Sequence, residues 1–225
     1  MGVFGIDVSH YQSETFVTNY VNTHDIKFLI AKATEGKTKV DSKFKYFMAF
    51  CKETGLLRGA YHYARPDLND PLPEALNFLE TIDDFVSQQD MLLALDWEGK
   101  SLNCSDTWAV EWLNIVEKNT GIKPLFYTSS SQTPNMKNVA ANGNGLWVAD
   151  YTAPINSIGD WKFWAIHQYN NQNIDEDVFN GTYEQLLKYA KSSKSPETSV
   201  DTSKCWYEQG QKEKCPVWRM LNGME

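Results

Sequence analysis

The sequence has little that would indicate a membrane, nucleic-acid-binding or disulfide-rich protein. Its 225 residues contain no apolar run of about 18 residues, so no membrane insertion is expected. The formal net charge is -8, which is unlike the basic surface of a nucleic-acid-binding protein. Four cysteines are too few for a disulfide scaffold, and their spacing matches no zinc site. We therefore expect no metal and no cofactor.

The start of the chain also lacks a recognisable targeting segment. The letters MGVFGIDVSHYQ include neither the basic part nor the long apolar part of a signal peptide. The composition that remains is that of a folded protein, with 42% hydrophobic and 22% charged residues. We expect one sizeable folded domain in a chain without a signal peptide.

A change of composition near residue 190 predicts a domain boundary. Residues 1–190 carry the regular patterns, and the segment that follows, KSSKSPETSVDTSK, is rich in Ser, Thr and Lys, as linkers are. The last stretch is too short for a core of its own. We predict a domain at 1–190 and a linker with a short tail of unknown role at 191–225, in which Cys205 and Cys215 could pair.

Short apolar runs alternate with helical patterns along the first domain. Alternation of this kind predicts parallel strands and an α/β fold. Seven or eight strands favour a closed barrel, and the short last connections leave no room for every crossover helix. We predict an irregular (β/α) barrel, similar to a TIM barrel with some crossover helices missing. The expected strands are 3–7, 27–33, 57–63, 91–98, 124–128, 146–151, 163–169 and 173–179, and the clearest helices are 73–86 and 105–118, the second capped by Ser105.

The stretch MLLALDWEGK places two carboxylates at the end of an apolar strand. Residues two apart on a strand point to the same side, so Asp96 and Glu98 share a face. Sites in parallel barrels lie where the strands end, and Asp7, Asp150 and Asp175 are expected at the same mouth. Crowded carboxylates raise each other's pKa, and a protonated carboxyl beside an ionised one is what glycosidic cleavage requires. The alternatives are solvated loop or capping residues and an oxygen-ligand cation site, although no EF-hand spacing occurs.

Aromatic residues accompany these acids. Side chains with an apolar face and a polar tip suit sugar rings, although core packing accounts equally well for about half of them. Lys32 lies in an apolar strand, so it should pair with Glu35 or with one of the mouth carboxylates. The aromatic residues in question are Tyr61, Tyr63, Tyr127, Trp147, Tyr151 and Tyr169, while His10, His62 and His167 are expected to be structural because no nucleophile motif accompanies them.

Eight motifs occur in an order that resembles the glycoside hydrolase family 25 lysozymes. They are FGIDVSHYQ, IAKATEG, RGAYHYARP, LALDWEG, PLFYTS, LWVADY, IHQYN and IDEDVF, and the resemblance extends over residues 3 to about 190. The resemblance implies an N-acetylmuramidase, of the kind common among phage endolysins and bacterial autolysins. It implies cleavage of the β-1,4 bond between N-acetylmuramic acid and N-acetylglucosamine in peptidoglycan. Because Asp96 and Glu98 share a face and approach the same region of the sugar, we predict retention through the substrate's own acetamide; the alternative is inversion with Asp7 or Asp175 as the base.

The resemblance also assigns residues. Glu98 would be the general acid, Asp96 would orient the acetamide, and Asp7 and Asp175 match the family's other two cleft aspartates. Two positions differ: His167 replaces the Trp of a W-Q-Y segment, and Asp175-Glu176-Asp177 stands in a V-D-x-N motif, which leaves Asp175 and Asp177 as alternatives. The expected substrate-binding residues are Tyr63, Tyr127, Trp147, Tyr151, Gln168 and Lys32.

Partners and location follow from the same resemblance. The expected partner is the glycan strand of peptidoglycan, bound by a monomer. If the protein is phage-encoded, it would stay in the host cytoplasm until a holin-type protein releases it to the cell wall. The alternatives are a catalytically silent peptidoglycan-binding structural module and a chitinase-like hydrolase, whose further aspartates would fall at Ala94 and Met91.

Overall fold

The computed structural model describes residues 2–86 and 90–191. The predicted linker and tail, with Cys205 and Cys215, lie outside the described residues beyond Lys191. None of the described helices combines the length and the apolar character that crossing a membrane requires.

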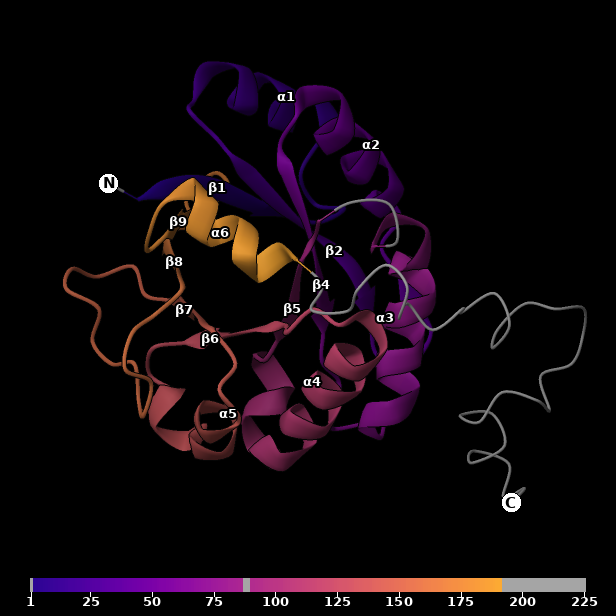
Figure 1. Ribbon diagram of the computed structural model, residues 1–225, viewed down its shortest axis with the longest axis vertical. Helices are drawn as coiled ribbons and strands as arrows, with labels where there is room; N and C mark the ends of the chain where they lie inside the picture. Colours follow the sequence, from indigo (N-terminus) through magenta and orange to yellow (C-terminus); the bar gives the residue numbers. More distant parts are fainter. Residues whose placement is uncertain (1, 87–89, 192–225) are drawn as a thin grey trace, which may run out of the picture. The chain divides into compact units, whose positions relative to one another are not determined.

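Eight strands of the described chain close into a barrel (Figure 1). β1 pairs with β2 on one side and with β9 on the other, and the remaining neighbours follow in the order β9-β8-β7-β6-β5-β4-β2. A short ninth strand, β3, pairs with the end of β2 outside the barrel. The strands are β1 Val3–Val8, β2 Phe28–Glu35, β3 Lys39–Val40, β4 Leu57–Tyr63, β5 Leu92–Asp96, β6 Leu125–Ser129, β7 Leu146–Ala149, β8 Ile166–Asn170 and β9 Asp175–Phe179.

Helices cover the outside of the barrel unevenly. α1 to α4 pack around the strands that they follow, whereas residues 150–165, between β7 and β8, run as a loop (Figure 1). The predicted irregular barrel with missing crossover helices is therefore confirmed. The helices are α1 Glu14–Thr23, α2 Phe44–Thr54, α3 Pro71–Val86, α4 Asp106–Thr120, α5 Lys137–Asn142 and α6 Tyr183–Ala190, with 3-10 turns η1 Gly99–Asn103 and η2 Thr133–Asn135.

The last strand departs from the parallel arrangement that the alternating pattern predicted. β9 runs antiparallel to both β8 and β1. Only residues 171–174 separate β8 from β9, and so short a connection can join neighbouring strands only as a hairpin. Because β9 is reversed, its first residue, Asp175, lies at the end of the barrel where the parallel strands finish.

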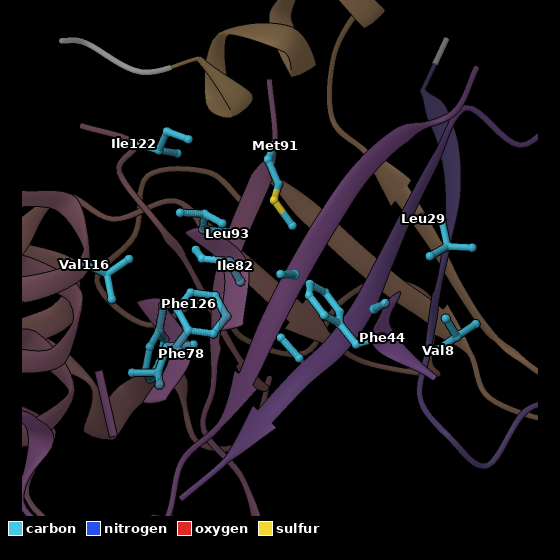
Figure 2. Close-up of a cluster of buried hydrophobic side chains, with 14 of the residues drawn as sticks. Val8, Leu29, Phe44, Phe78, Ile82, Met91, Leu93, Val116, Ile122 and Phe126 are labelled. Carbon is cyan, nitrogen blue, oxygen red and sulfur yellow. The ribbon is translucent and has the colours of Figure 1, made fainter. Parts of the chain in front are cut away.

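Two hydrophobic layers hold the barrel. The outer layer lies between strands and helices, and Figure 2 shows Phe44, Phe78, Leu93 and Phe126 within it. The inner layer fills the barrel from the end where the parallel strands begin, where Leu186 and Ala190 of α6 pack against residues such as Leu92. The Met91 N–H donates to the Ala190 carbonyl at 3.0 Å, which fixes α6 at that end. The opposite end is left for polar side chains.

Candidate active site

Alternation along β5 directs two acids into the mouth of the barrel. Asp96 ends the strand with Tyr63 and Tyr127 as its neighbours on β4 and β6. Trp97 faces the other way and is fully buried near Trp108, with a ring-centroid distance of 5.8 Å. The Trp97 N–H donates to the Tyr127 carbonyl at 2.9 Å, so the strand pairing extends past Asp96. The tryptophan thus anchors the segment while its two acidic neighbours face the cleft.

Gly99 turns the chain immediately after Glu98. Its φ is +58°, a conformation that favours glycine, and a Cβ at this position would lie 2.7 Å from the Tyr63 hydroxyl. The chain enters η1 at this residue, and Glu98 precedes the turn in extended conformation. Glu98 is exposed, whereas Asp96 is only 6% exposed. The two carboxyls therefore differ in their access to solvent.

Four of the five acids that the sequence placed at the mouth come together around one cleft. This cavity has a volume of about 180 Å³. Four of its lining residues are the acids assigned by the resemblance, and four are predicted substrate-binding residues; Tyr61 adds a ninth that the predicted set left out. The lining consists of Asp7, Tyr61, Asp96, Glu98, Tyr127, Trp147, Tyr151, Gln168 and Asp175.

Gln168 organises one wall of this cleft. Its side-chain N–H donates to Asp7 Oδ2 at 2.7 Å. Its amide oxygen accepts from the hydroxyls of Tyr127, at 3.1 Å, and Tyr151, at 2.7 Å. Asp7 and Asp175 are direct neighbours across the antiparallel β1–β9 pair, which explains how residues from the two ends of the domain meet. Gln168 thereby fixes one acid and two aromatic side chains at once.

Burial raises the pKa of each acid in the cleft, and repulsion by neighbouring acids adds to this rise for Asp7, Asp96 and Glu98. Burial has the largest effect on the pKa of Asp7, followed by the charges of Asp177 and Asp175. Burial and then Glu98 raise the pKa of Asp96. Although the Glu98 residue as a whole is exposed, its carboxyl is partly desolvated in the cleft, and this desolvation raises its pKa. Lys32 opposes the rise, and Asp175 adds to it. Burial also raises the pKa of Asp175. A carboxyl with a raised pKa holds a proton that it can donate near neutral pH.

Lys32 and Tyr63 lie beside the cleft and do not line it. Lys32 Nζ is 2.8 Å from Glu35 Oε2 and 4.5 Å from the centre of the Tyr63 ring. The predicted pairing of Lys32 with Glu35 is confirmed. The lysine also lowers the pKa of Asp96 and Glu98, so it acts on the acids through its charge.

Two residues differ from their expected roles. Trp147 is only 2% exposed, and its indole N–H donates to Asp177 Oδ1 at 2.8 Å, so it supports the floor and offers no open face to a sugar. Asp150 was expected at the mouth, yet it accepts hydrogen bonds from the backbone of Thr152 and Asn156. Burial alone would raise the pKa of Asp150, but these hydrogen bonds lower it. Asp150 therefore shapes the loop after β7.

The histidines are structural, as predicted. His62 is fully buried between Thr34 Oγ1, at 2.7 Å, and Glu74 Oε2, at 2.8 Å. His10 pairs with Asp41 at 2.7 Å, and His167 contacts the Asp150 carbonyl at 2.7 Å. None of the three lines the cleft.

The structure also separates the two aspartates of β9. Asp175 lines the cleft, whereas Asp177 is fully buried one inward-facing position further along the strand. The sequence signal for Asp177 was the two-residue period itself, which places it on the same face as Asp175.

Comparisons with known proteins agree with this geometry. The chain is 34% identical to the uncharacterized protein YegX of Escherichia coli O157:H7 over 206 residues, which cover 85% of this chain and 75% of that protein. It is 28% identical to Lysozyme M1 of Streptomyces globisporus, over 85% and 72% of the two chains. A family GH25 lysozyme from Aspergillus fumigatus superposes with a TM-score of 0.73 at 29% identity, over 85% of this chain and all of the other. The family model for glycosyl hydrolases family 25 matches residues 6–178, and the chain therefore belongs to that family of glycoside hydrolases.

Proposed function

We propose that the protein is a lysozyme that cleaves the β-1,4 bond between N-acetylmuramic acid and N-acetylglucosamine in peptidoglycan. The observation that carries this proposal is the pairing of exposed Glu98, whose pKa is raised, with buried Asp96 in one cleft. Glycoside hydrolases need one carboxyl that donates a proton and one that stabilises the positive charge opposite it. The similarity to Lysozyme M1 and to the GH25 lysozyme supports the substrate class.

Glu98 is the general acid in this proposal. As the bond between the anomeric carbon and the bridging oxygen breaks, the Glu98 proton passes to that oxygen, and the sugar on the leaving side departs as an alcohol. A raised pKa keeps this proton in place at higher pH than for an ordinary glutamate.

The acetamide of N-acetylmuramic acid acts as the nucleophile. Its carbonyl oxygen attacks the anomeric carbon and forms a cyclic oxazolinium ion. Asp96 Oδ1 is buried and has no hydrogen-bond partner within the described chain, so it is available to accept the acetamide N–H. Glu98, now ionised, takes a proton from a water molecule that opens the ring. Two displacements at one carbon give net retention of configuration.

Proton NMR of the first-formed product tests this mechanism. A β-anomer that appears before mutarotation is expected, because the substrate bond is β and configuration is retained. An α-anomer would contradict substrate assistance and would assign the base role to Asp7 or Asp175. Mass spectrometry of digested cell walls tests the bond: N-acetylmuramic acid should carry every new reducing end.

The alternative is a catalytically silent module that binds peptidoglycan. The complete set of cleft acids favours an enzyme. A turbidity assay on isolated cell walls separates the two functions, since a binding module would leave the turbidity unchanged at every protein concentration.

A further inference from the structure

A second buried carboxyl lies directly behind the cleft. Asp177 is fully buried, and its Oδ1 accepts the Trp147 indole N–H at 2.8 Å. Its Oδ2 has no N–H or O–H donor in the described ranges when both aspartates are ionised. Asp7 is its diagonal neighbour on the same face of the β1–β9 pair, because Asp177 lies opposite Gly5 and Asp175 lies opposite Asp7. A hydrogen bond with Asp7 also lowers the pKa of Asp177. Asp7 in turn accepts from Gln168 on Oδ2, so its remaining hydrogen-bonding capacity is available to Asp177.

Two ionised carboxylates cannot form a hydrogen bond with each other, because both are acceptors only. Burying both as anions would add strong repulsion to the cost of desolvation. One proton between them removes both problems, since the protonated carboxyl becomes a donor and the pair carries a single negative charge.

We propose that Asp7 and Asp177 share one proton in the folded protein, and that Asp177 is a positioning residue that holds Asp7 at the floor of the cleft. The shared proton is a property of the folded protein without substrate and does not depend on the proposed function. Only the expected effect of Asp177 on activity rests on that function. Three observations support it: the Trp147 indole N–H on Oδ1 of Asp177, the buried Oδ2 without a partner among the described residues, and the diagonal position of Asp7 on the neighbouring strand.

The charges around the pair are consistent with a retained proton. Asp175 on β9 faces both aspartates, and Asp96 on β5 faces Asp7. The hydroxyls of Tyr61 on β4 and Tyr127 on β6 lie in the same cleft, and their own pKa values are raised by burial and by neighbouring acids that include Asp7. Burial is the largest cause that raises the pKa of both Asp7 and Asp177. The two should titrate as one coupled pair.

Infrared spectroscopy of the folded protein in D₂O at neutral pH tests the shared proton. The wild type should show the carbonyl stretch of a protonated carboxylic acid. Asp177→Asn and Asp7→Asn should each lose the same component, because an asparagine can donate to the remaining carboxylate and no proton is then needed. Glu176→Gln is the matched control: this residue is adjacent on β9 and its pKa is lowered, so the band should stay.

The infrared result has two outcomes that overturn the proposal. If neither asparagine variant reduces the band, the pair is fully ionised. If each variant removes one part of the carboxylic-acid band and a second part that belongs to the Asp7–Asp177 pair remains, each aspartate holds its own proton. Circular dichroism of every variant at the same pH confirms that the spectra compare folded proteins.

Thermal unfolding against pH gives a second readout. A carboxyl whose pKa is raised by folding stabilises the folded state at low pH, and this contribution falls as pH rises above about 4, the unfolded value. Asp177→Asn removes one such carboxyl, so its unfolding midpoint should fall less steeply with pH than that of the wild type. Identical slopes would overturn the proposal.

Kinetics then test the positioning role. Asp177→Ala should lower kcat on soluble glycan fragments by roughly tenfold or more, because Asp7 loses a buried partner, with a smaller change in KM. Asp177→Asn should restore most of that loss. If the asparagine is no more active than the alanine while both are folded, Asp177 does not act by hydrogen bonding to Asp7.

Discussion

Glu98 and Asp96 are two residues apart and share a face, yet only Glu98 is exposed. Glu98→Gln keeps the shape of the side chain and removes the proton. We expect activity to fall by ~10²–10⁴-fold with the thermal unfolding midpoint nearly unchanged, because general acid catalysis contributes about that much. Lysis of cell walls by purified protein measures the effect, with Glu176→Gln as the control. Near-wild-type activity of folded Glu98→Gln would remove this residue from the mechanism.

We expect Lys32 to set the pH range over which the proposed general acid, Glu98, is active. A general acid is active while protonated, so activity should fall as pH rises through the raised pKa of Glu98. Lys32 favours the ionised form of Glu98 and Asp96 and lowers their pKa. Lys32→Met should therefore move the alkaline limb of the kcat profile to higher pH.

The control for this change is Lys39→Met. Lys39 Nζ lies 3.4 Å from the same Glu35 oxygen, but its side chain is mostly exposed. Lys32, and not Lys39, is among the charges that shift the pKa of Asp96 and Glu98. The alkaline limb of the Lys39→Met profile should coincide with that of the wild type. A profile of Lys32→Met that shifts to lower pH, or does not move, would show that the lysine charge does not reach Glu98.

At the scale of elements, the turn after β5 holds Glu98 at the rim of the cleft. Gly99→Ala combines a positive φ with a Cβ that would lie 2.7 Å from the Tyr63 hydroxyl. We expect a loss of ~1–3 kcal/mol in the free energy of unfolding and a clear loss of kcat, because the chain must shift next to Glu98. Chemical denaturation and kinetics on soluble fragments measure the two effects.

Gly55 offers a matched control at the end of α2. Its φ is +73°, but a Cβ there meets nothing within 4 Å. Gly55→Ala should cost about 1–2 kcal/mol from backbone strain alone and should leave activity unchanged in the folded protein. Equal activity losses in both alanine variants would mean that the contact with Tyr63 is unimportant.

Some elements were readable from the sequence because their patterns are local. β5 is buried on both faces, so its apolar run ending in Asp96 was visible, and Ser105 was recognisable as a cap because it precedes a helical stripe. The reversed direction of β9 was hidden, since period two is the same for parallel and antiparallel strands. Asp150 was misplaced because an acid at a strand end serves a cleft or a loop equally well.

The floor of the site depended on contacts between distant elements. In the sequence, Trp147 appears as one apolar residue of a strand. No neighbouring residue indicates that its indole N–H donates to Asp177, which is 30 residues away. The roles of Asp7, Asp96, Glu98 and Asp175 remain predictions, although the structure does bring them together around one cleft.

At the scale of the whole molecule, α6 closes the end of the barrel opposite the cleft. A chain that ends at Lys191 keeps Leu186 and Ala190 in the inner layer, whereas one that ends at Asn180 loses them. We expect the longer chain to unfold cooperatively and to cleave soluble glycan fragments. The shorter chain should be strongly destabilised, because each large buried side chain contributes ~1.5–3 kcal/mol. Calorimetry and fragment cleavage measure both.

The outcome also tests the proposed boundary of the catalytic domain. If the chain ending at Lys191 aggregates or loses its cooperative transition, residues beyond 191 belong to the core. If the chain ending at Asn180 is as stable as the longer one, α6 is dispensable and the inner layer closes without it.

The closure of the barrel by β1 and β9 has a consequence for biosynthesis. Asp7 belongs to the first strand, and its partner Gln168 is 161 residues further along the chain. When β1 to β7 have been synthesised, the chain therefore contains only some of the acids of the cleft, and its sheet is still open. The cleft cannot assemble until the last hairpin emerges, so a chain that stops before β9 should have no hydrolytic activity. Contacts of such long range are also formed late and slowly during folding.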